Sequence, residues 1–180
     1  MKKRKKIITV ALDSGAAAGA GTVAKTIATH YNLFYLDTGK IYRFIGNLKL
    51  LNSKKFNYSL IKKKMKNLKI QDLQNKNLLR NEVAMSASII AKDNKIRKLV
   101  RNFQIECAYN PPKKYNGSIL DGRDITSVIM KDAMFKFFIT ANIKTRTLRR
   151  YKEFKNLNKK ISYNEVFKSI KNRDKSDKSR

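Results

Sequence analysis

Small residues fill a stretch that lies between an apolar, β-branched segment and a helical pattern. The stretch consists of Ser14, Gly15, Ala16, Ala17, Ala18, Gly19, Ala20, Gly21 and Thr22. Side chains this small let a phosphate approach the backbone, and successive N–H groups of such a loop and of the helix after it bind one anion. The stretch therefore predicts a loop that holds the phosphates of a nucleotide.

Position 20 departs from the usual form of this loop, G-x-x-x-x-G-K-[ST], in which a lysine reaches the transferred phosphate. Here Ala20 follows Gly19. The loop alone leaves two hypotheses open: a nucleotide enzyme of reduced activity, or a strand–turn–helix joint in which small residues only allow close contact. Lys40 is a candidate substitute for the lysine, whereas we expect Lys25 to face outward from the helix.

Arginines and carboxylates recur in four further blocks of the sequence. The blocks contain Asp37 with Arg43, Ser88 with Arg97, Asp121 to Asp124 including Arg123, and Arg173 with Asp177 and Arg180. Planar guanidinium groups bind phosphate oxygens bidentately, in a way that lysine cannot. Taken singly, each arginine could be a solvated helix residue, and Asp124 could cap a helix.

In this order, and after a phosphate-type loop, the four blocks resemble those of the bacterial cytidylate kinases, which are nucleoside monophosphate kinases. The resemblance covers nearly all of the 180 residues. It implies ATP-dependent phosphoryl transfer, with Mg²⁺ as cofactor, to CMP or dCMP, which gives CDP or dCDP. Such transfer needs positioning and charge neutralisation more than covalent help.

The resemblance also implies roles for individual residues. The implied catalytic set is Arg43 and Arg123, which hold the acceptor 5′-phosphate, with Arg149 and Arg150, which belong to a lid over the reacting phosphates. The implied CMP contacts are Asp37, Arg43, Ser88, Arg97, Arg123, Asp124, Arg173, Asp177 and Arg180. A hydroxyl, a guanidinium and a carboxylate at Ser88, Arg97 and Asp124 suit the amino donor and two acceptors of cytosine. We assign no metal ligand among the side chains.

Three departures from the family pattern accompany the resemblance. Ser14 and Gly15 stand where a Gly-Pro pair is usual, and Ala20 stands for the lysine. Residues 52–78 are shorter than the inserted sheet region of the family, and only Leu68–Ile70 is similar to one of its strands. Family members continue for another strand and helix, so we expect these to be absent and the chain to be incomplete at its C-terminus.

The alternation of apolar runs and helical patterns predicts an α/β fold with a P-loop-type parallel sheet wound by helices. We expect strands near 6–12, 33–36, 118–121 and 135–140. We expect helices at 21–31, 40–51, 79–92 and 93–108, with a basic helical tail from 144. In helix 21–31, Val23, Ile27 and Tyr31 should lie on one side. Residues 1–180 form one predicted domain, with an NMP-binding insert at about 52–92 and a lid at about 144–165.

Composition limits the function classes. A hydrophobic content of 42% supports a folded core, and no apolar run approaches the roughly 20 residues of a membrane span. A single cysteine excludes an internal disulfide, so we expect a cytoplasmic protein, and we expect a monomer. The net charge of +29 raises the alternative of a basic RNA-binding protein. Because the lysines are scattered, we expect no nucleic-acid partner. A catalytically weak or inactive nucleotide-binding relative is the other alternative.

Overall fold

The computed structural model describes residues 7–156 and 160–178, and its centre is a four-stranded sheet. The strands are β1 (Ile8–Ser14), β2 (Leu33–Asp37), β3 (Gly117–Gly122) and β4 (Phe135–Ile139). Their order is β2-β3-β1-β4, and every neighbouring pair is parallel. The predicted parallel α/β sheet is thus confirmed. The carboxyl ends of β2, β3 and β1 lie at one edge, where Asp37 is opposite Asp121.

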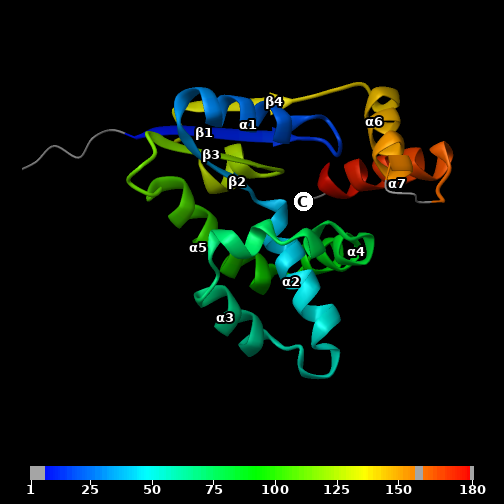
Figure 1. The fold of residues 1–180 in the computed structure, drawn as a ribbon, viewed down its shortest axis with the longest axis horizontal. Helices are drawn as coiled ribbons and strands as arrows, with labels where there is room; N and C mark the ends of the chain where they lie inside the picture. The colour runs from blue at the N-terminus through cyan, green and yellow to red at the C-terminus, as the bar shows by residue number, and fades with distance from the viewer. Residues whose placement is uncertain (1–6, 157–159, 179–180) are drawn as a thin grey trace, which may run out of the picture.

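Helix α1 (Ala20–Tyr31) covers one face of this sheet, mainly with a stripe of alanines (Figure 1). Ala20, Ala24 and Ala28 are its buried residues, whereas Val23 and Tyr31 are 38% and 54% exposed. Of the three residues predicted to share one side of the helix, Ile27 packs against the sheet, whereas Val23 and Tyr31 face outward. Alanine methyl groups let the helix lie close against Val10, Leu12 and Ile119 of the sheet.

The other face of the sheet carries a larger core with four helices (Figure 1). They are α2 (Gly39–Leu51), α3 (Tyr58–Lys66), α4 (Asn81–Ile90) and α5 (Asn94–Tyr109). Asp93 caps α5 by accepting hydrogen bonds from the backbone of Lys95 and Ile96. Helices α2 and α4 touch at Gly46, where a Cβ atom would lie 2.9 Å from the Ala87 nitrogen. The predicted helices 40–51, 79–92 and 93–108 are confirmed within a few residues.

The segment 52–92 is helical throughout its regular structure, and the similarity of Leu68–Ile70 to a strand is not borne out. Around α3, three short 3₁₀ helices occupy Ser53–Lys55, Ile70–Gln74 and Lys76–Leu79. A local hydrogen bond favours the 3₁₀ helix at Ile70–Gln74 over an extended chain, because the Asp72 carboxylate accepts from the Lys69 nitrogen at 2.9 Å. Leu68, Leu73 and Leu78 of this segment are buried, so their side chains pack into the protein interior.

Two further helices, α6 (Ile143–Asn156) and α7 (Tyr163–Lys178), lie beyond the carboxyl edge of the sheet (Figure 1). Helix α7 runs back toward the start of α2, which brings its last turns to the edge where β1 and β3 end. These two helices correspond to the predicted basic tail from 144. Within the described ranges, none of the helices combines the length and the apolar character that crossing a bilayer requires.

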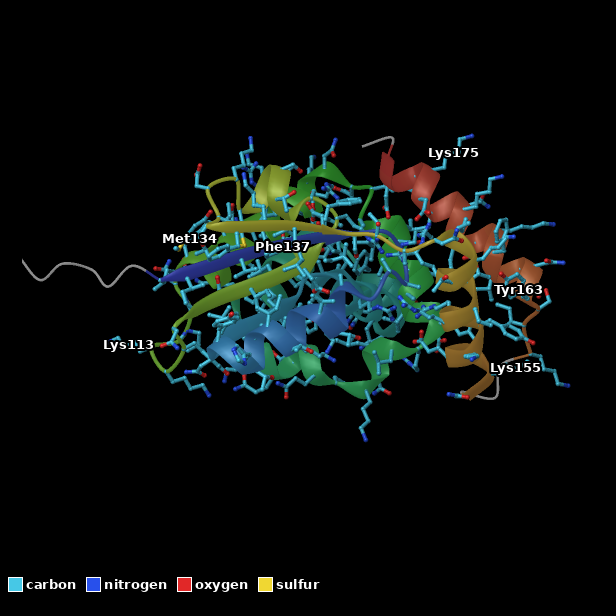
Figure 2. The ribbon with its side chains drawn as sticks, turned by 90° about the horizontal axis from the view of Figure 1, so that it is seen from above. Lys113, Met134, Phe137, Lys155, Tyr163 and Lys175 are labelled. Carbon is cyan, nitrogen blue, oxygen red and sulfur yellow. The ribbon has the colours of Figure 1, made fainter. Side chains whose placement is uncertain are left out.

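Strand β4 forms one edge of the sheet and exposes apolar side chains. Phe135, Phe137 and Phe138 are 48%, 43% and 70% exposed, and Met134 precedes them. Figure 2 shows Met134 and Phe137 along this edge, whereas Lys113, Lys155 and Lys175 project outward elsewhere on the molecule. These three lysines therefore lie far apart on the surface and do not form one patch.

Candidate active site

The small-residue stretch forms the loop between β1 and α1, as predicted. Gly19, with φ 98°, precedes the first residue of α1, and Ala17 also has a left-handed backbone, with φ 58°. The first N–H groups of α1 have no partner within their helix, and the helix dipole adds positive potential there. Ala20 is buried at 4% exposure and brings no charge to this point. The loop has the backbone of an anion site without a cationic side chain of its own.

Carbonyl groups of this loop accept hydrogen bonds from arginines that lie far away in the sequence. The pairs are Arg123 Nη1 to Ser14 O, Arg146 Nη1 to Ala16 O at 3.1 Å, and Arg149 Nη1 to Ala18 O at 3.1 Å. One arginine follows β3, and the other two come from α6. Every second carbonyl from position 14 to position 18 is therefore turned toward a guanidinium group, which fixes the course of the loop.

Arg146 is a functional residue that the sequence analysis missed. It is buried and donates to both carboxylate oxygens of Asp174 in α7, at 3.0 and 2.6 Å, and to the carbonyl of Ala141. These bonds join α6, α7 and the phosphate loop in one network. A weak signal was available: Arg146 lies one helical turn before Arg149 and Arg150, on a helix that the sequence marks as basic.

Four arginines gather near the carboxyl edge, three of them from the predicted catalytic set. Burial lowers the pKa of Arg43, and the charges of Arg150 and Arg173 lower it further, against the opposing effect of Asp37. Burial also lowers the pKa of Arg123, followed by the charge of Arg173, while Asp177 opposes the shift. Guanidinium groups that repel one another in this way create a strong field for an anion.

Several contacts hold these arginines in place. Arg43 donates to the carbonyl of Leu78 at 2.8 Å, and Arg123 Nε lies 3.5 Å from a carboxylate oxygen of Asp177. Arg150 pairs with Glu153 on its own helix at 2.8 Å. Of the other predicted contacts, Arg173 lies in α7, and Arg180 lies outside the described residues, as do 157–159 of the predicted lid.

The structure brings together two of the three residues assigned to the cytosine base. Arg97 of α5 forms an ion pair with Asp124, and the two side chains are 27% and 29% exposed. Ser88 is exposed, and its hydroxyl donates to the Met85 carbonyl of α4 at 2.8 Å, so it is bound to its own helix and not to this pair. The pair is therefore partly accessible to solvent, and it offers a guanidinium donor and a carboxylate acceptor.

Asp13, at the end of β1, fixes the segment that carries Arg123 and Asp124. Its buried carboxylate accepts hydrogen bonds from the backbone of Ile125 at 2.7 Å and of Thr126 at 3.0 Å, and from the Thr126 hydroxyl at 2.5 Å. These bonds begin a one-turn π-helix, Ile125–Ile129. Because the turn starts directly after Asp124, the position of Asp13 on the sheet determines where the arginine and the acid lie.

Two carboxylates occupy the ends of β2 and β3. The pKa of Asp121 is raised to about 7, first by burial and then by the charge of Asp37, while the Tyr35 hydroxyl, which donates at 3.3 Å, opposes the shift. A Cβ atom on Gly21 would lie 3.5 Å from Asp121 Oδ2, so this carboxylate faces the start of α1. Carboxylate oxygens beside a phosphate loop are the ligands that Mg²⁺ prefers, so the residues present fit a magnesium ion that arrives with ATP.

Comparison with known proteins agrees with this geometry. The sequence profile of the cytidylate kinases matches residues 10–180. The chain is 37% identical to a cytidylate kinase of Bartonella tribocorum, over 93% of this chain and 77% of the relative. It is 34% identical to a cytidylate kinase of Clostridium botulinum, over 96% of this chain and 82% of the relative.

A solved structure supports the fold. An uncharacterized protein from Eubacterium ventriosum superposes with a TM-score of 0.52 at 20% identity, covering 97% of this chain and 74% of that one. At this identity the likeness concerns the α/β architecture alone. With the profile match and the curated relatives, which cover most of the sequence, the conclusion on family is direct: the chain belongs to the cytidylate kinase family.

Proposed function

We propose that this protein transfers a phosphoryl group from ATP to CMP or dCMP, giving CDP or dCDP. The observation that carries the proposal is the convergence of Arg43, Arg123, Arg150 and Arg173, of which Arg123 donates to the phosphate loop. A lone phosphate site would not need so many mutually repelling guanidinium groups. Two nucleotides whose phosphates meet at one point would need them, because their negative charges must be neutralised together.

On the acceptor side, Arg43 and Arg123 hold the 5′-phosphate of CMP. The Arg97–Asp124 pair reads the base: the carboxylate accepts from the exocyclic amino group of cytosine, and the guanidinium donates to its ring acceptors. Ser88 joins this contact by a rotation of its hydroxyl away from Met85. Arg173 and Asp177 contact the ribose, and Arg180 supplies a further CMP contact.

On the donor side, the backbone N–H groups of residues 14–22 hold the phosphates of ATP, with Arg149 and Arg150 over them. Asp37 and Asp121, together with the hydroxyl of Thr22, would hold Mg²⁺. Bound there, the ion would supply positive charge that neutralises part of the charge of the phosphates. The protein's own task is to align the two phosphates and to exclude water; segment 144–165 acts as the lid, and 52–92 as the insert over CMP.

The assay that tests the proposal follows CDP formation from CMP and ATP, with dCMP, UMP and AMP as competing acceptors. We expect turnover with CMP and dCMP and a strong preference over UMP, because UMP lacks the amino group that Asp124 accepts. Saturable CMP binding without CDP would favour the binding-only relative that Ala20 suggests. A salt-sensitive affinity for RNA that exceeds the affinity for CMP would favour an RNA-binding protein. The protein is expected to act as a monomer in the cytoplasm.

A further inference from the structure

The positive charge at the phosphate loop must come from outside the loop, because none of residues 14–22 is charged. Three guanidinium groups touch the loop, but two of them are paired with acids. Arg123 has Asp177 at 3.5 Å, and Arg146 has Asp174 at 2.6 Å. Arg149 has no carboxylate within ion-pair distance in the described part of the chain. It is the uncompensated cation on the loop.

The position of Arg149 suits the phosphates. Its Nη1 donates to the carbonyl of Ala18 at 3.1 Å, and a Cβ atom on Gly19 would lie 3.3 Å from the same nitrogen. The guanidinium group therefore lies against the two residues that precede Ala20, while its side chain is otherwise exposed. One of its donors orders the loop, and the other four N–H donors make no hydrogen bond within the described residues, so an anion can accept them.

We propose that Arg149 supplies the charge that a lysine at position 20 supplies in a complete phosphate loop. This inference rests on the proposed function and concerns the ATP side of the same site. A guanidinium group can serve because it is always charged and binds two phosphate oxygens at once. It differs from a loop lysine in one respect: it reaches the phosphates only when α6 is docked, through Arg146 and Asp174, against the loop. The two other candidates are Lys40, at the start of α2, and Lys25, whose charge acts on Asp121.

A double-mutant cycle tests the substitution. The proteins are the parent, Arg149→Ala, Ala20→Lys and the double variant, with Lys152→Ala as the matched control because Lys152 is an exposed cation on the same helix. Each protein is assayed for kcat in CDP formation, for affinity toward a non-hydrolysable ATP analogue with Mg²⁺, and for CMP affinity. Arg149→Lys and circular dichroism separate loss of charge from loss of folding.

We expect Arg149→Ala to lower kcat by about 100-fold, the usual cost of one preorganised charge contact, and to weaken binding of the ATP analogue. CMP affinity should change less than about threefold, since Arg149 does not touch the acceptor residues. Ala20→Lys should restore most of the lost rate in the Arg149→Ala background, while adding little to the parent. Arg149→Lys should keep part of the rate, and Lys152→Ala should resemble the parent.

Three outcomes would overturn the proposal. Equal losses on removal of Arg149 from the parent and from the Ala20→Lys variant would give Arg149 a separate role. Losses with Lys40→Ala or Lys25→Ala that Ala20→Lys rescues would move the role to that lysine. A large gain from Ala20→Lys alone would mean that nothing has replaced the charge. If the proposed function itself is wrong, no protein in the series forms CDP or binds CMP. The affinities of the four proteins for the ATP analogue still show whether Ala20→Lys compensates for the loss of Arg149.

Discussion

The acceptor and donor sides of the site differ in how their positive charge is supplied. On the acceptor side, Arg43 and Arg123 follow β2 and β3 closely in the sequence, so the sheet itself positions them. On the donor side, the loop after β1 is uncharged, and its cations Arg146 and Arg149 come from 130 and 131 positions further along. The acceptor side depends on local structure, whereas the donor side depends on the docking of α6.

This difference has a consequence for how the two sides respond to change. A substitution at the contact of α6 with α7 should weaken ATP binding more than CMP binding, although α7 also carries Arg173 and Asp177 of the acceptor side. A substitution next to β3 should do the reverse. Arg123 is the exception that connects the sides, because it donates to the loop carbonyl of Ser14 and also belongs to the acceptor arginines.

The largest effect is expected from Arg123→Ala, which removes a charge from the acceptor side. Affinity for CMP should fall at least about 100-fold, about 2.7 kcal/mol, because charge-assisted contacts with the 5′-phosphate are lost. Cytidine has no phosphate to lose, so its affinity should change less than about threefold. Isothermal titration calorimetry with both ligands measures the difference.

The control for this variant is Arg101→Ala, an exposed arginine of α5 that contacts the Val128 carbonyl at 3.4 Å. It should bind CMP and cytidine like the parent. Equal losses of CMP and cytidine affinity in Arg123→Ala would show that Arg123 does not contact the phosphate. They would also contradict the proposed difference between the acceptor and donor sides.

The next largest effect concerns the docking of α6. Arg146→Ala leaves Asp174 without its bidentate partner and two carbonyl groups without a donor, so the free energy of unfolding should fall by about 2–3 kcal/mol. Urea denaturation measures this loss. Glu153→Ala is the matched control, because it breaks the exposed ion pair with Arg150 on one helix and should cost no more than about 0.5 kcal/mol.

A calorimetric titration sharpens the comparison in the same variant. If α6 serves the donor side, Arg146→Ala should weaken the ATP analogue more than it weakens CMP. Equal weakening of both ligands would show that α6 supports the whole site, and the distinction between a local and a docked side would not hold.

The sequence predicted the layout of the sheet well, and the reason is physical. Strands β1 to β3 are largely buried, so each reads as a short apolar run, and β4 is an apolar run as well although its side chains are exposed at the edge. All four strands lie within two residues of the predicted ranges. The acidic ends at Asp37 and Asp121 follow from the same runs. Periodicity alone did not show which side of α1 faces the sheet, because the large apolar residues and the alanines form separate stripes and the short distance to the sheet selects the alanines.

Long-range contacts were the part that could not be predicted. The spacing of Arg146 and Arg149 in a basic helix gives no indication that they reach the carbonyls of Ala16 and Ala18. Asp13 likewise ends a strand in the sequence, and only the fold reveals that it holds the turn after Asp124. The residue types predicted phosphate chemistry. Which arginine contacts which part of the site depends on contacts between segments that are far apart in the sequence.

A smaller effect is expected from the acid pair that lies between the two sides. The folded protein holds the pKa of Asp121 at about 7, against 3.8 for an ordinary aspartate, so the folded state binds this proton more tightly than the unfolded chain. The stabilising contribution is complete below pH 4 and is lost as the pH rises through 7. The expected fall between those values is about 1–2 kcal/mol, less than the full shift implies because the side chain is half-buried.

Urea denaturation of the parent and of Asp121→Asn at a series of pH values isolates this effect, since the other titrating groups are common to both proteins. The difference between the two curves should be flat above pH 7 and should change between pH 4 and 7. Parallel curves over the whole range would mean that Asp121 has the same pKa in the folded and the unfolded protein, so that burial and Asp37 do not shift it.

The smallest expected effect comes from the backbone of the donor loop. Ala17 has φ 58°, a left-handed conformation that costs an alanine about 1–2 kcal/mol and a glycine almost nothing. Glycine loses more conformational entropy on folding, by about 0.4–1 kcal/mol, so Ala17→Gly should raise the free energy of unfolding by about 0.5–1 kcal/mol. Thermal and urea denaturation both measure a change of this size.

Asn32 provides the control, because it has φ 50° at the end of α1, tolerates this conformation, and donates through its side chain to the Lys114 carbonyl at 3.0 Å. Asn32→Gly removes that bond and should not stabilise the protein. Ala17→Gly should also leave CMP affinity unchanged, since the loop contacts the donor. If glycine at position 17 lowers stability, the strained loop is not the conformation in solution, and the donor side would have to be organised by more than the docked arginines of α6.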